Sequence, residues 1–412
     1  MAARWQNMHV CLFRVQHRKI GLMNLRSFQV PTVVKHALGA VACLADEVKA
    51  LGMQRPLLVA GQGLVRIGIV DEVIALLKTA GIDYVLFDQV IENPPIALVD
   101  QGAEVYRQAA CDGLIGLGGG SSMDTAKAIG VLVAQGGSIR AYEWADPNPI
   151  TQHIPPLIAI PTTAGTGSEV TLWSVITDLE RHIKYNVGGT PLIGPHVALI
   201  DPLLTVSMPA PLTAGTGMDA LAHAIECYTC AYAQAWPDAV ALQAMEYVGD
   251  YLRVAYAQGH NQEARYKMAM AAMLGGMAYG TESAGAAHAM SQTAGGVHVT
   301  VPHGQLTAWL LGPVMEYNYL GEPQKFARIA KALGEDTRGL TVWQAAEKAV
   351  EAVYKLIKDL QIPSLQALGF TEAEIPLLAD IAFKDPQTFG NPRDLTYDAY
   401  VQLYQRAFDL GK

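Results

Sequence analysis

The sequence predicts a doubly wound α/β domain followed by an all-α domain. Through the first half of the chain, short apolar runs alternate with helical patterns, which is typical of a parallel sheet covered by helices on both faces. Beyond about residue 205 the alternation ends, and long helical patterns rich in Ala and Met follow. A length of 412 residues also favours two domains. We therefore expect an extension over residues 1–26, an α/β domain over 27–205 and a helical domain over 206–412.

The expected elements of the first domain follow one another in a regular order. Residues 27–52 predict a short strand and a helix, and residues 55–68 a buried strand with a glycine-containing turn. Helix 69–79, strand 82–88, a turn at Pro94 and Pro95, helix 96–110, strand 111–117 and helix 121–135 come next. Residues 155–171 predict a strand and a polar loop, 174–189 a hairpin and 196–205 the last strand.

Composition narrows the classes of function. Hydrophobic residues make up 51% of the chain and charged residues 16%, which is enough for sizeable buried cores. The formal net charge of -9 argues against nucleic acid or an anionic membrane surface as partner. Five cysteines favour a reducing cytoplasm, and we expect the Cys227-x-x-Cys230 pair to be packing residues. No apolar run approaches the ~18 residues of a membrane-spanning helix.

Residues 1–26 are basic and mildly amphipathic, without the continuous apolar centre of a secretory signal. Three alternatives remain open for this segment. The alternatives are a targeting peptide, a disordered arm and sequence upstream of a true start at Met23.

Two loops of the first domain have the composition of nucleotide-binding loops. Gly118, Gly119 and Gly120 lie between a buried strand and a helix, where glycines let a pyrophosphate approach the backbone amides of the helix N-terminus. Ser121 or Ser122 could cap that helix or bind phosphate. The alternative is an ordinary tight turn, with Asp124 and Lys127 paired on the surface. A second loop ends another strand and offers four hydroxyls and two glycines, at Thr162, Thr163, Gly165, Thr166, Gly167 and Ser168.

Metal-ligand residues occur in the second half of the chain. Asp219 and His223 are four residues apart in a predicted helix and therefore lie on one face. His288 lies among small apolar residues, and His303 stands between Pro302 and Gly304. One carboxylate and three imidazoles would suit Fe(II) or Zn(II) and leave the positive charge that a Lewis acid needs. The alternative for Asp219 and His223 is an ordinary hydrogen bond within the helix.

Five motifs in order and at matching spacing resemble the iron-containing (group III) alcohol dehydrogenases: GGGSSMDTAK, PTTAGTGSEVT, GMDALAHAIE, HAM…PHG and FGNPRD. The resemblance runs from about Phe28 to near the C-terminus. It implies a Rossmann-like dinucleotide-binding domain, a helical metal-binding domain and a catalytic cleft between them. It also implies a cytoplasmic homodimer or higher homo-oligomer that acts on a small alcohol or aldehyde.

The resemblance assigns roles to individual residues. The metal, Fe(II) or alternatively Zn(II), would be held by Asp219, His223, His288 and His303, and it would activate the alcohol oxygen for hydride transfer to NAD or NADP. The pyrophosphate would lie on Gly119, Gly120 and Ser121 beside Asp124. The rest of the cofactor would be lined by Asn93, Thr162, Thr163, Thr166 and Lys184.

This chain departs from the family pattern at two positions. Many members have a proton-relaying histidine four residues after the third ligand, and here that position is Gln292, which cannot titrate. We expect protons to leave through ordered water and the cofactor ribose, with His298 as the nearest titratable side chain in sequence. NAD-preferring members often have an Asp after the first strand of the dinucleotide fold, where this chain has Gly61, so NADP remains open.

The sequence therefore predicts a metal-dependent NAD(P) alcohol dehydrogenase or aldehyde reductase. Two alternatives share its fold, a hydroxyacid–oxoacid transhydrogenase and a Zn-dependent polyol dehydrogenase. A third alternative is a nucleotide-binding structural protein whose catalytic site has been lost. The presence of all four candidate metal ligands argues against it.

Overall fold

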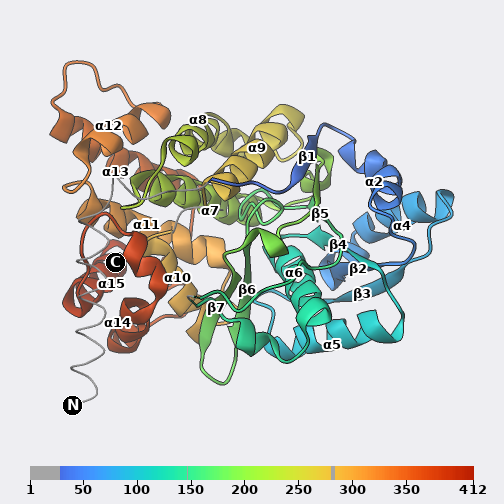
Figure 1. Cartoon of the computed structure of the whole chain (residues 1–412). Helices are drawn as coiled ribbons and strands as arrows, with labels where there is room; N and C mark the ends of the chain where they lie inside the picture. Colours follow the sequence, from blue (N-terminus) through green and yellow to red (C-terminus); the bar gives the residue numbers. More distant parts are fainter. Residues whose placement is uncertain (1–27, 146, 280–283) are drawn as a thin grey trace, which may run out of the picture.

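A computed structural model of the chain describes residues 28–145, 147–279 and 284–412. Figure 1 shows the two parts, with the sheet and its helices on the right and a helical assembly on the left. The architecture confirms the predicted fold class, a doubly wound parallel sheet followed by a helical half. The last strand of the large sheet ends at Ile200 and the first long helix begins at Ala210, on either side of the predicted domain boundary.

The six-stranded sheet has the strand order β1-β8-β5-β4-β2-β3. Every neighbouring pair of strands in it is parallel. Its central strands are buried on both faces and are correspondingly continuous apolar runs, such as LIAIP in β5. The strands are β1 (Val33–His36), β2 (Pro56–Gly61), β3 (Val85–Val90), β4 (Gly113–Gly118), β5 (Leu157–Pro161) and β8 (Val197–Ile200).

Helices cover both faces of this sheet, because each crossover between parallel strands must return over a face. The helices are α2 (Leu44–Ala50), α3 (Gln62–Arg66), α4 (Ile69–Thr79), α5 (Ile96–Gln108) and α6 (Gly120–Gln135). The segment after β2 differs from the prediction of a turn, since α3 begins directly after Gly61. The predicted hairpin is confirmed as β6 (Trp173–Asp178) paired antiparallel with β7 (Ile183–Gly188).

The helical half is built around α7, which is buried over nearly its whole length from Thr213 to Thr229. Helices α8, α9 and α11 pack against it, and Cys227 and Cys230 are buried there, as predicted. The helix begins at Ala210, seven residues before Gly217 at the start of the GMDALAHAIE motif, and Pro211 is compatible with its first turn. The helices are α7 (Ala210–Thr229), α8 (Ala235–Ala257), α9 (Gln262–Tyr279), α10 (Ala286–Val297), α11 (His303–Asn318), α12 (Pro323–Ala332), α13 (Val342–Asp359), α14 (Ile375–Lys384) and α15 (Tyr397–Leu410).

Glycines let the two halves approach each other closely at the loop after β5. A Cβ atom on Gly167, whose φ is +62°, would lie 2.5 Å from the carbonyl oxygen of Ala272 in α9. A Cβ atom on Gly165 would lie 2.8 Å from the Cβ of Thr216 in α7. These glycines therefore place the polar loop of the α/β half directly against the helix that carries Asp219 and His223.

Among the residues that the structure describes, no helix combines the length and the apolar character that a membrane crossing requires.

Candidate metal centre and cofactor cleft

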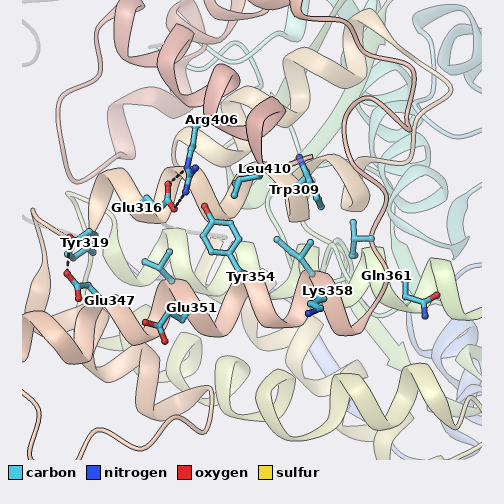
Figure 2. A pocket seen from close by; sticks show the side chains of 13 residues that line it. Trp309, Glu316, Tyr319, Glu347, Glu351, Tyr354, Lys358, Gln361, Arg406 and Leu410 are labelled. Atoms are coloured by element: carbon cyan, nitrogen blue, oxygen red, sulfur yellow. Dashed lines mark hydrogen bonds and ion pairs between the residues drawn. The ribbon is translucent and has the colours of Figure 1, made fainter. Parts of the chain in front are cut away.

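The cavities of small-molecule size among the described residues include two in different parts of the fold. One of about 1040 Å³ lies in the helical half, between α11, α13 and α15. Figure 2 shows its lining, which includes Trp309, Tyr319, Tyr354 and the ion pair between Glu316 and Arg406. None of the site residues expected from the sequence lies in it.

All the site residues expected from the sequence line the other cavity, of about 770 Å³. Its floor comes from loops at the carboxyl ends of β2, β3, β4 and β5, which is where open α/β sheets bind ligands. Helices α7, α9, α10 and α11 supply the other wall. The predicted residues in its lining are Gly61, Asn93, Gly119, Gly120, Ser121, Asp124, Thr162, Thr163, Thr166, Lys184, Asp219, His223, His288, Gln292 and His303.

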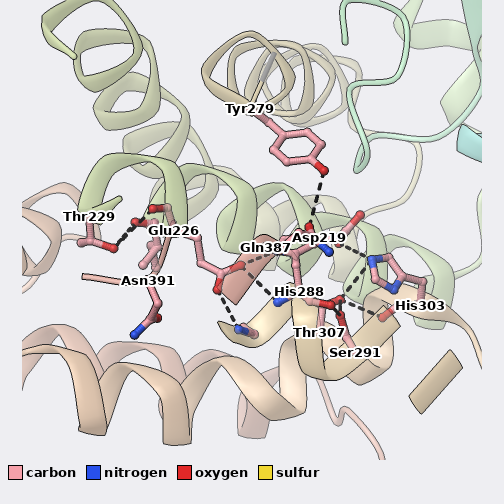
Figure 3. A network of polar contacts seen from close by, with 12 residues as sticks. Asp219, Glu226, Thr229, Tyr279, His288, Ser291, His303, Thr307, Gln387 and Asn391 are labelled. Carbon is pink, nitrogen blue, oxygen red and sulfur yellow. Dashed lines mark hydrogen bonds and ion pairs between the residues drawn. The ribbon is translucent and has the colours of Figure 1, made fainter. Parts of the chain in front are cut away.

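Three of the four predicted metal ligands bring donor atoms together. One donor atom from each of Asp219, His288 and His303 lies within 4.8 Å of the other two. The Nε2 atoms of both His288 and His303 are 3.6 Å from Oδ1 of Asp219, too far for a hydrogen bond. Figure 3 shows these side chains converging from α7, α10 and α11. His223 lies outside this group of donor atoms, but its ring stacks on that of His288 with centroids 4.3 Å apart.

The chemistry of these side chains fits a metal ion. Each of the four carries a buried polar atom with no hydrogen-bond partner among the described residues: Oδ1 of Asp219, Nδ1 of His223, Nε2 of His288 and Nδ1 of His303. Buried polar atoms are nearly always satisfied, because an unmet one costs about 1–3 kcal/mol. Four such atoms on residues that line one cavity indicate a bound group that would accept their lone pairs, as a divalent cation would.

Buried charges set the proton affinities of this cluster. Burial would raise the pKa of Asp219, but the neighbouring imidazoles of His223 and His303 hold it below its ordinary value. Burial and the nearby His288 lower the pKa of His223 to about 4. Burial lowers the pKa of His288, yet the carboxylates of Glu226 and Asp219 outweigh it and raise that pKa to about 9. Binding of a metal to His288 would therefore displace a proton.

Glu226 is a buried partner of the cluster that the sequence analysis missed. Its carboxylate accepts a hydrogen bond from Nδ1 of His288 and another, of 2.7 Å, from the backbone N–H of Ala287. Glu226 follows Asp219 and His223 by seven and three residues, so it lies on the same face of α7. This helical spacing is the signal by which Glu226 could have been found from the sequence.

The glycine loop after β4 leaves the start of α6 open toward the cavity. Gly119 is the residue that precedes the helix, and no side chain caps the helix N-terminus. The loop lies against the Thr-rich loop, since a Cβ on Gly120 would be 2.7 Å from Cγ2 of Thr166 and one on Gly119 would be 3.2 Å from Oγ1 of Thr163. The free backbone N–H groups of the first helical turn are the donors that a pyrophosphate would need.

Lys127 and Asp124 do not pair on the surface, which was the ordinary alternative. Lys127 is fully buried, and its Nζ is 3.9 Å from Oδ1 of Asp124. The ammonium donates to the carbonyl oxygens of Ser168 and Trp173, at 2.7 and 2.8 Å. Oδ2 of Asp124 accepts from the backbone N–H of Val175 at 3.0 Å. Through these bonds Lys127 and Asp124 tie α6 to the loop between β5 and β6 and to β6 itself.

Gln292 faces the cavity, and its Oε1 is buried without a hydrogen-bond partner among the described residues. His298 lies elsewhere. Its Nε2 is 2.6 Å from Oε1 of Glu374, and its ring packs on Phe370 with centroids 4.1 Å apart. His298 was to assist proton transfer only if it reached the cleft, and in this structure it lies just after α10, outside the lining of the cavity.

The lining residues that were not predicted include Glu92, Trp173 and Tyr279. Glu92 accepts a hydrogen bond from the backbone N–H of His303, and burial raises its pKa. Trp173 and Tyr279 are neighbours, with ring centroids 6.3 Å apart. Nothing in the local sequence distinguishes Trp173 and Tyr279 from core aromatics, and only the approach of the first residue of β6 to the last residue of α9 reveals them.

A doubly wound sheet thus faces a cluster of imidazoles and a carboxylate across a cleft, an arrangement that suits an oxidoreductase. Residues 31–202 match the family model of iron-containing alcohol dehydrogenase, and residues 213–408 match the model of the C-terminal part of the same family. The chain belongs to the iron-containing alcohol dehydrogenase family, whose members oxidise alcohols or reduce aldehydes.

Similar proteins cover nearly the whole chain. The choline dehydrogenase of Bacillus subtilis (strain 168) is 55% identical over 390 residues, which are 94% of this chain and 96% of that protein. The NAD-dependent methanol dehydrogenase of Bacillus methanolicus is 39% identical over 93% of this chain and 100% of that protein. The crystal structure of a 1,3-propanediol oxidoreductase superposes with a TM-score of 0.90 at 38% identity, covering 93% of this chain and 100% of that one.

Proposed function

We propose that this protein is a metal-dependent, NAD(P)-linked alcohol dehydrogenase that also reduces the corresponding aldehydes. The observation that carries the proposal is the position of four unsatisfied ligand atoms in the same cavity as an uncapped, glycine-led helix N-terminus. One side of the cavity thus suits a divalent metal, Fe(II) or Zn(II), and the other a dinucleotide.

The residues divide between two binding tasks. Asp219, His223, His288 and His303 would hold the metal, with Glu226 fixing the orientation of the His288 ring. Gly119, Gly120 and Ser121 would bind the pyrophosphate at the start of α6. Asn93, Thr162, Thr163, Thr166 and Lys184 would line the rest of the cofactor, and Asp124 would hold the surrounding loops together. When bound, the metal supplies a Lewis acid for the substrate oxygen and the nicotinamide supplies the hydride acceptor.

The path of the hydroxyl proton depends on this chain's own residues. Gln292 faces the cavity but cannot titrate, so its amide can only orient a hydroxyl or a water. His298 is paired with Glu374 outside the lining. We therefore infer that the proton leaves through ordered water and the cofactor ribose.

The substrate is a small alcohol, and an amino alcohol of the choline type is the strongest candidate. Support comes from the 55% identity to a choline dehydrogenase, compared with 39% to a methanol dehydrogenase. A transhydrogenase is the alternative on the same fold, and it would turn over with 2-oxoglutarate in the absence of free cofactor.

Metal analysis combined with kinetics tests the proposal. Purified protein should hold about one Fe or Zn per chain, and chelation should abolish turnover of alcohols with NAD or NADP while leaving circular dichroism unchanged. His288→Ala should lose metal and turnover together. Exposed His260 provides the matched control, since His260→Ala should retain both. Full activity in metal-free protein would refute the proposal.

A further inference from the structure

We propose that the aromatic wall formed by Trp173 and Tyr279 recognises a quaternary ammonium group two carbons away from the reacting hydroxyl. This inference rests on the proposed function, and it names the substrate class as choline-like alcohols. The rings of Trp173 and Tyr279 lie at one end of the cavity that contains the metal ligands.

Tyr279 places an aromatic surface next to the metal centre. It is the last residue of α9, and its ring centroid is 5.1 Å from that of His223. Its ring is also nearly parallel to that of His288, with an interplanar angle of 16° and centroids 6.3 Å apart. Tyr279 therefore lies close enough to Asp219, His288 and His303 in the same cavity to contact a substrate whose oxygen is near them.

Trp173 extends this surface and is held from behind. Its ring centroid is 6.3 Å from that of Tyr279, and Trp144 packs edge-on against it with centroids also 6.3 Å apart. Its backbone carbonyl accepts a hydrogen bond from the buried ammonium of Lys127. Support from both directions keeps the indole in place, so little conformational entropy would be lost when a ligand binds.

An aromatic wall suits a trimethylammonium group better than hydrogen-bonding side chains do. That cation has no N–H to donate, so its recognition depends on the electron-rich faces of Trp and Tyr and on contacts with its methyl groups. Figure 3 shows Tyr279 near Asp219 and His288, with its hydroxyl directed toward Gln387. The only hydrogen bond of the Tyr279 hydroxyl to a described residue is the long one of 3.5 Å to Oε1 of Gln387.

The charge of the site also admits a cation. The two buried carboxylates Asp219 and Glu226 would together offset the formal charge of a divalent metal held by the proposed ligands. Lys184 is the only Lys or Arg among the described residues that line the cavity, and it interacts electrostatically with Glu92. A positively charged substrate therefore meets little net repulsion at this end of the cavity.

The test compares choline with 3,3-dimethylbutan-1-ol, a neutral alcohol of the same shape, in the metal-loaded enzyme with NAD. The measured quantity is the ratio of kcat/KM for choline to kcat/KM for the neutral alcohol. In the unmodified enzyme we expect a ratio of about 10 or more, and Trp173→Leu and Tyr279→Leu should each lower it about tenfold. Trp173→Phe, which keeps an aromatic face, should recover part of the loss.

Choline binding measured by calorimetry gives a readout that does not depend on turnover. Trp173→Leu should weaken binding about tenfold. Two matched controls should bind choline as the unmodified enzyme does: Trp343→Leu, which removes an exposed indole from α13, and Tyr319→Leu, which removes a ring from the other cavity. Weaker binding in Tyr319→Leu with normal binding in Trp173→Leu would overturn the inference.

The two proposals fail in distinguishable ways. If simple alcohols are oxidised but choline has no advantage over its neutral analogue, the aromatic recognition is wrong and the alcohol dehydrogenase stands. If no alcohol is oxidised with either cofactor, the function itself is wrong.

Discussion

Glu226 accepts a hydrogen bond from Nδ1 of His288, and the other ring nitrogen, Nε2, faces Asp219 at a distance of 3.6 Å from its Oδ1. The carboxylate selects the tautomer whose free nitrogen faces the proposed metal, and it also accepts the backbone N–H of Ala287 at the start of α10. A residue of α7 thereby sets the direction of a ligand carried by another helix.

Replacement of Glu226 by glutamine should weaken metal binding about 10–100-fold. The amide keeps the size of the side chain, but it lacks the negative charge and no longer selects one tautomer of His288. The measurement is the metal dissociation constant, obtained by competition with a chelator of known affinity. Glu246→Gln on the exposed face of α8 is the control. An unchanged dissociation constant in Glu226→Gln would show that this carboxylate serves packing alone.

Replacement of Gly61 by aspartate should discriminate between the two nicotinamide cofactors. Gly61 lines the cavity at the end of β2, so a carboxylate there would repel the 2′-phosphate of NADPH. We expect the unmodified enzyme to accept NADPH at least comparably to NADH, and the variant to lose roughly tenfold or more in kcat/KM for NADPH relative to NADH.

Gly61→Ala is the matched control for that prediction. A Cβ at this position would lie 3.0 Å from the carbonyl oxygen of Val90, so any side chain displaces the neighbouring backbone slightly. The alanine variant carries this steric effect without the charge, and it should impair both cofactors equally. Strict dependence of the unmodified enzyme on NADH would contradict the alignment of Gly61 with the ribose.

Replacement of Gln292 by histidine should add an ionisation to the pH profile of turnover. Gln292 faces the cavity beside the metal ligands, and a histidine there would titrate at roughly 6.5, its reference pKa. The measurement is kcat against pH for the unmodified enzyme, Gln292→His and His298→Ala. Because His298 lies outside the lining, its removal should leave the profile as it is. If Gln292→His has an unaltered profile and Gln292→Ala is fully active, Gln292 has no part in the reaction.

Glu169 should make the folded state less stable as the pH rises from about 4.5 to 7. Burial raises the pKa of this carboxyl from 4.5 to about 7, with Lys127 opposing the shift. Within that window the folded protein keeps a proton that the unfolded chain has released, so the free energy of unfolding falls with increasing pH. Glu169→Gln removes this titration. The free energy of unfolding of the variant, relative to that of the unmodified protein, should therefore increase as the pH rises through this window.

Chemical denaturation at about pH 4.5 and about pH 8 measures this difference. Glu104→Gln, on the exposed face of α5, is the control and should follow the unmodified protein at both values. A constant difference between Glu169→Gln and the unmodified protein would mean that Glu169 titrates normally in the folded state.

Local periodicity by itself determined much of this protein. Alternating strand and helix patterns predicted the parallel sheet, because each pattern depends only on neighbouring residues. The i, i+4 spacing placed Asp219 and His223 on one face of α7, and the glycines between β4 and α6 indicated an open helix N-terminus. These predictions succeeded since the geometry of one helix or one turn is set within a few residues. The resemblance to a family then joined His288 and His303 to them.

Tertiary structure alone decided which residues meet across long separations in the chain. It buried Lys127 against Ser168 and Trp173 instead of leaving it on the surface, and it turned His298 toward Glu374 and away from the cleft. It also brought Trp173 of β6 beside Tyr279 of α9, 106 residues later in the chain. A sequence pattern shows which face of an element is apolar, but many other apolar faces could cover it. Only the packing of the whole chain selects the partner, because that choice depends on how all the elements fill the core together.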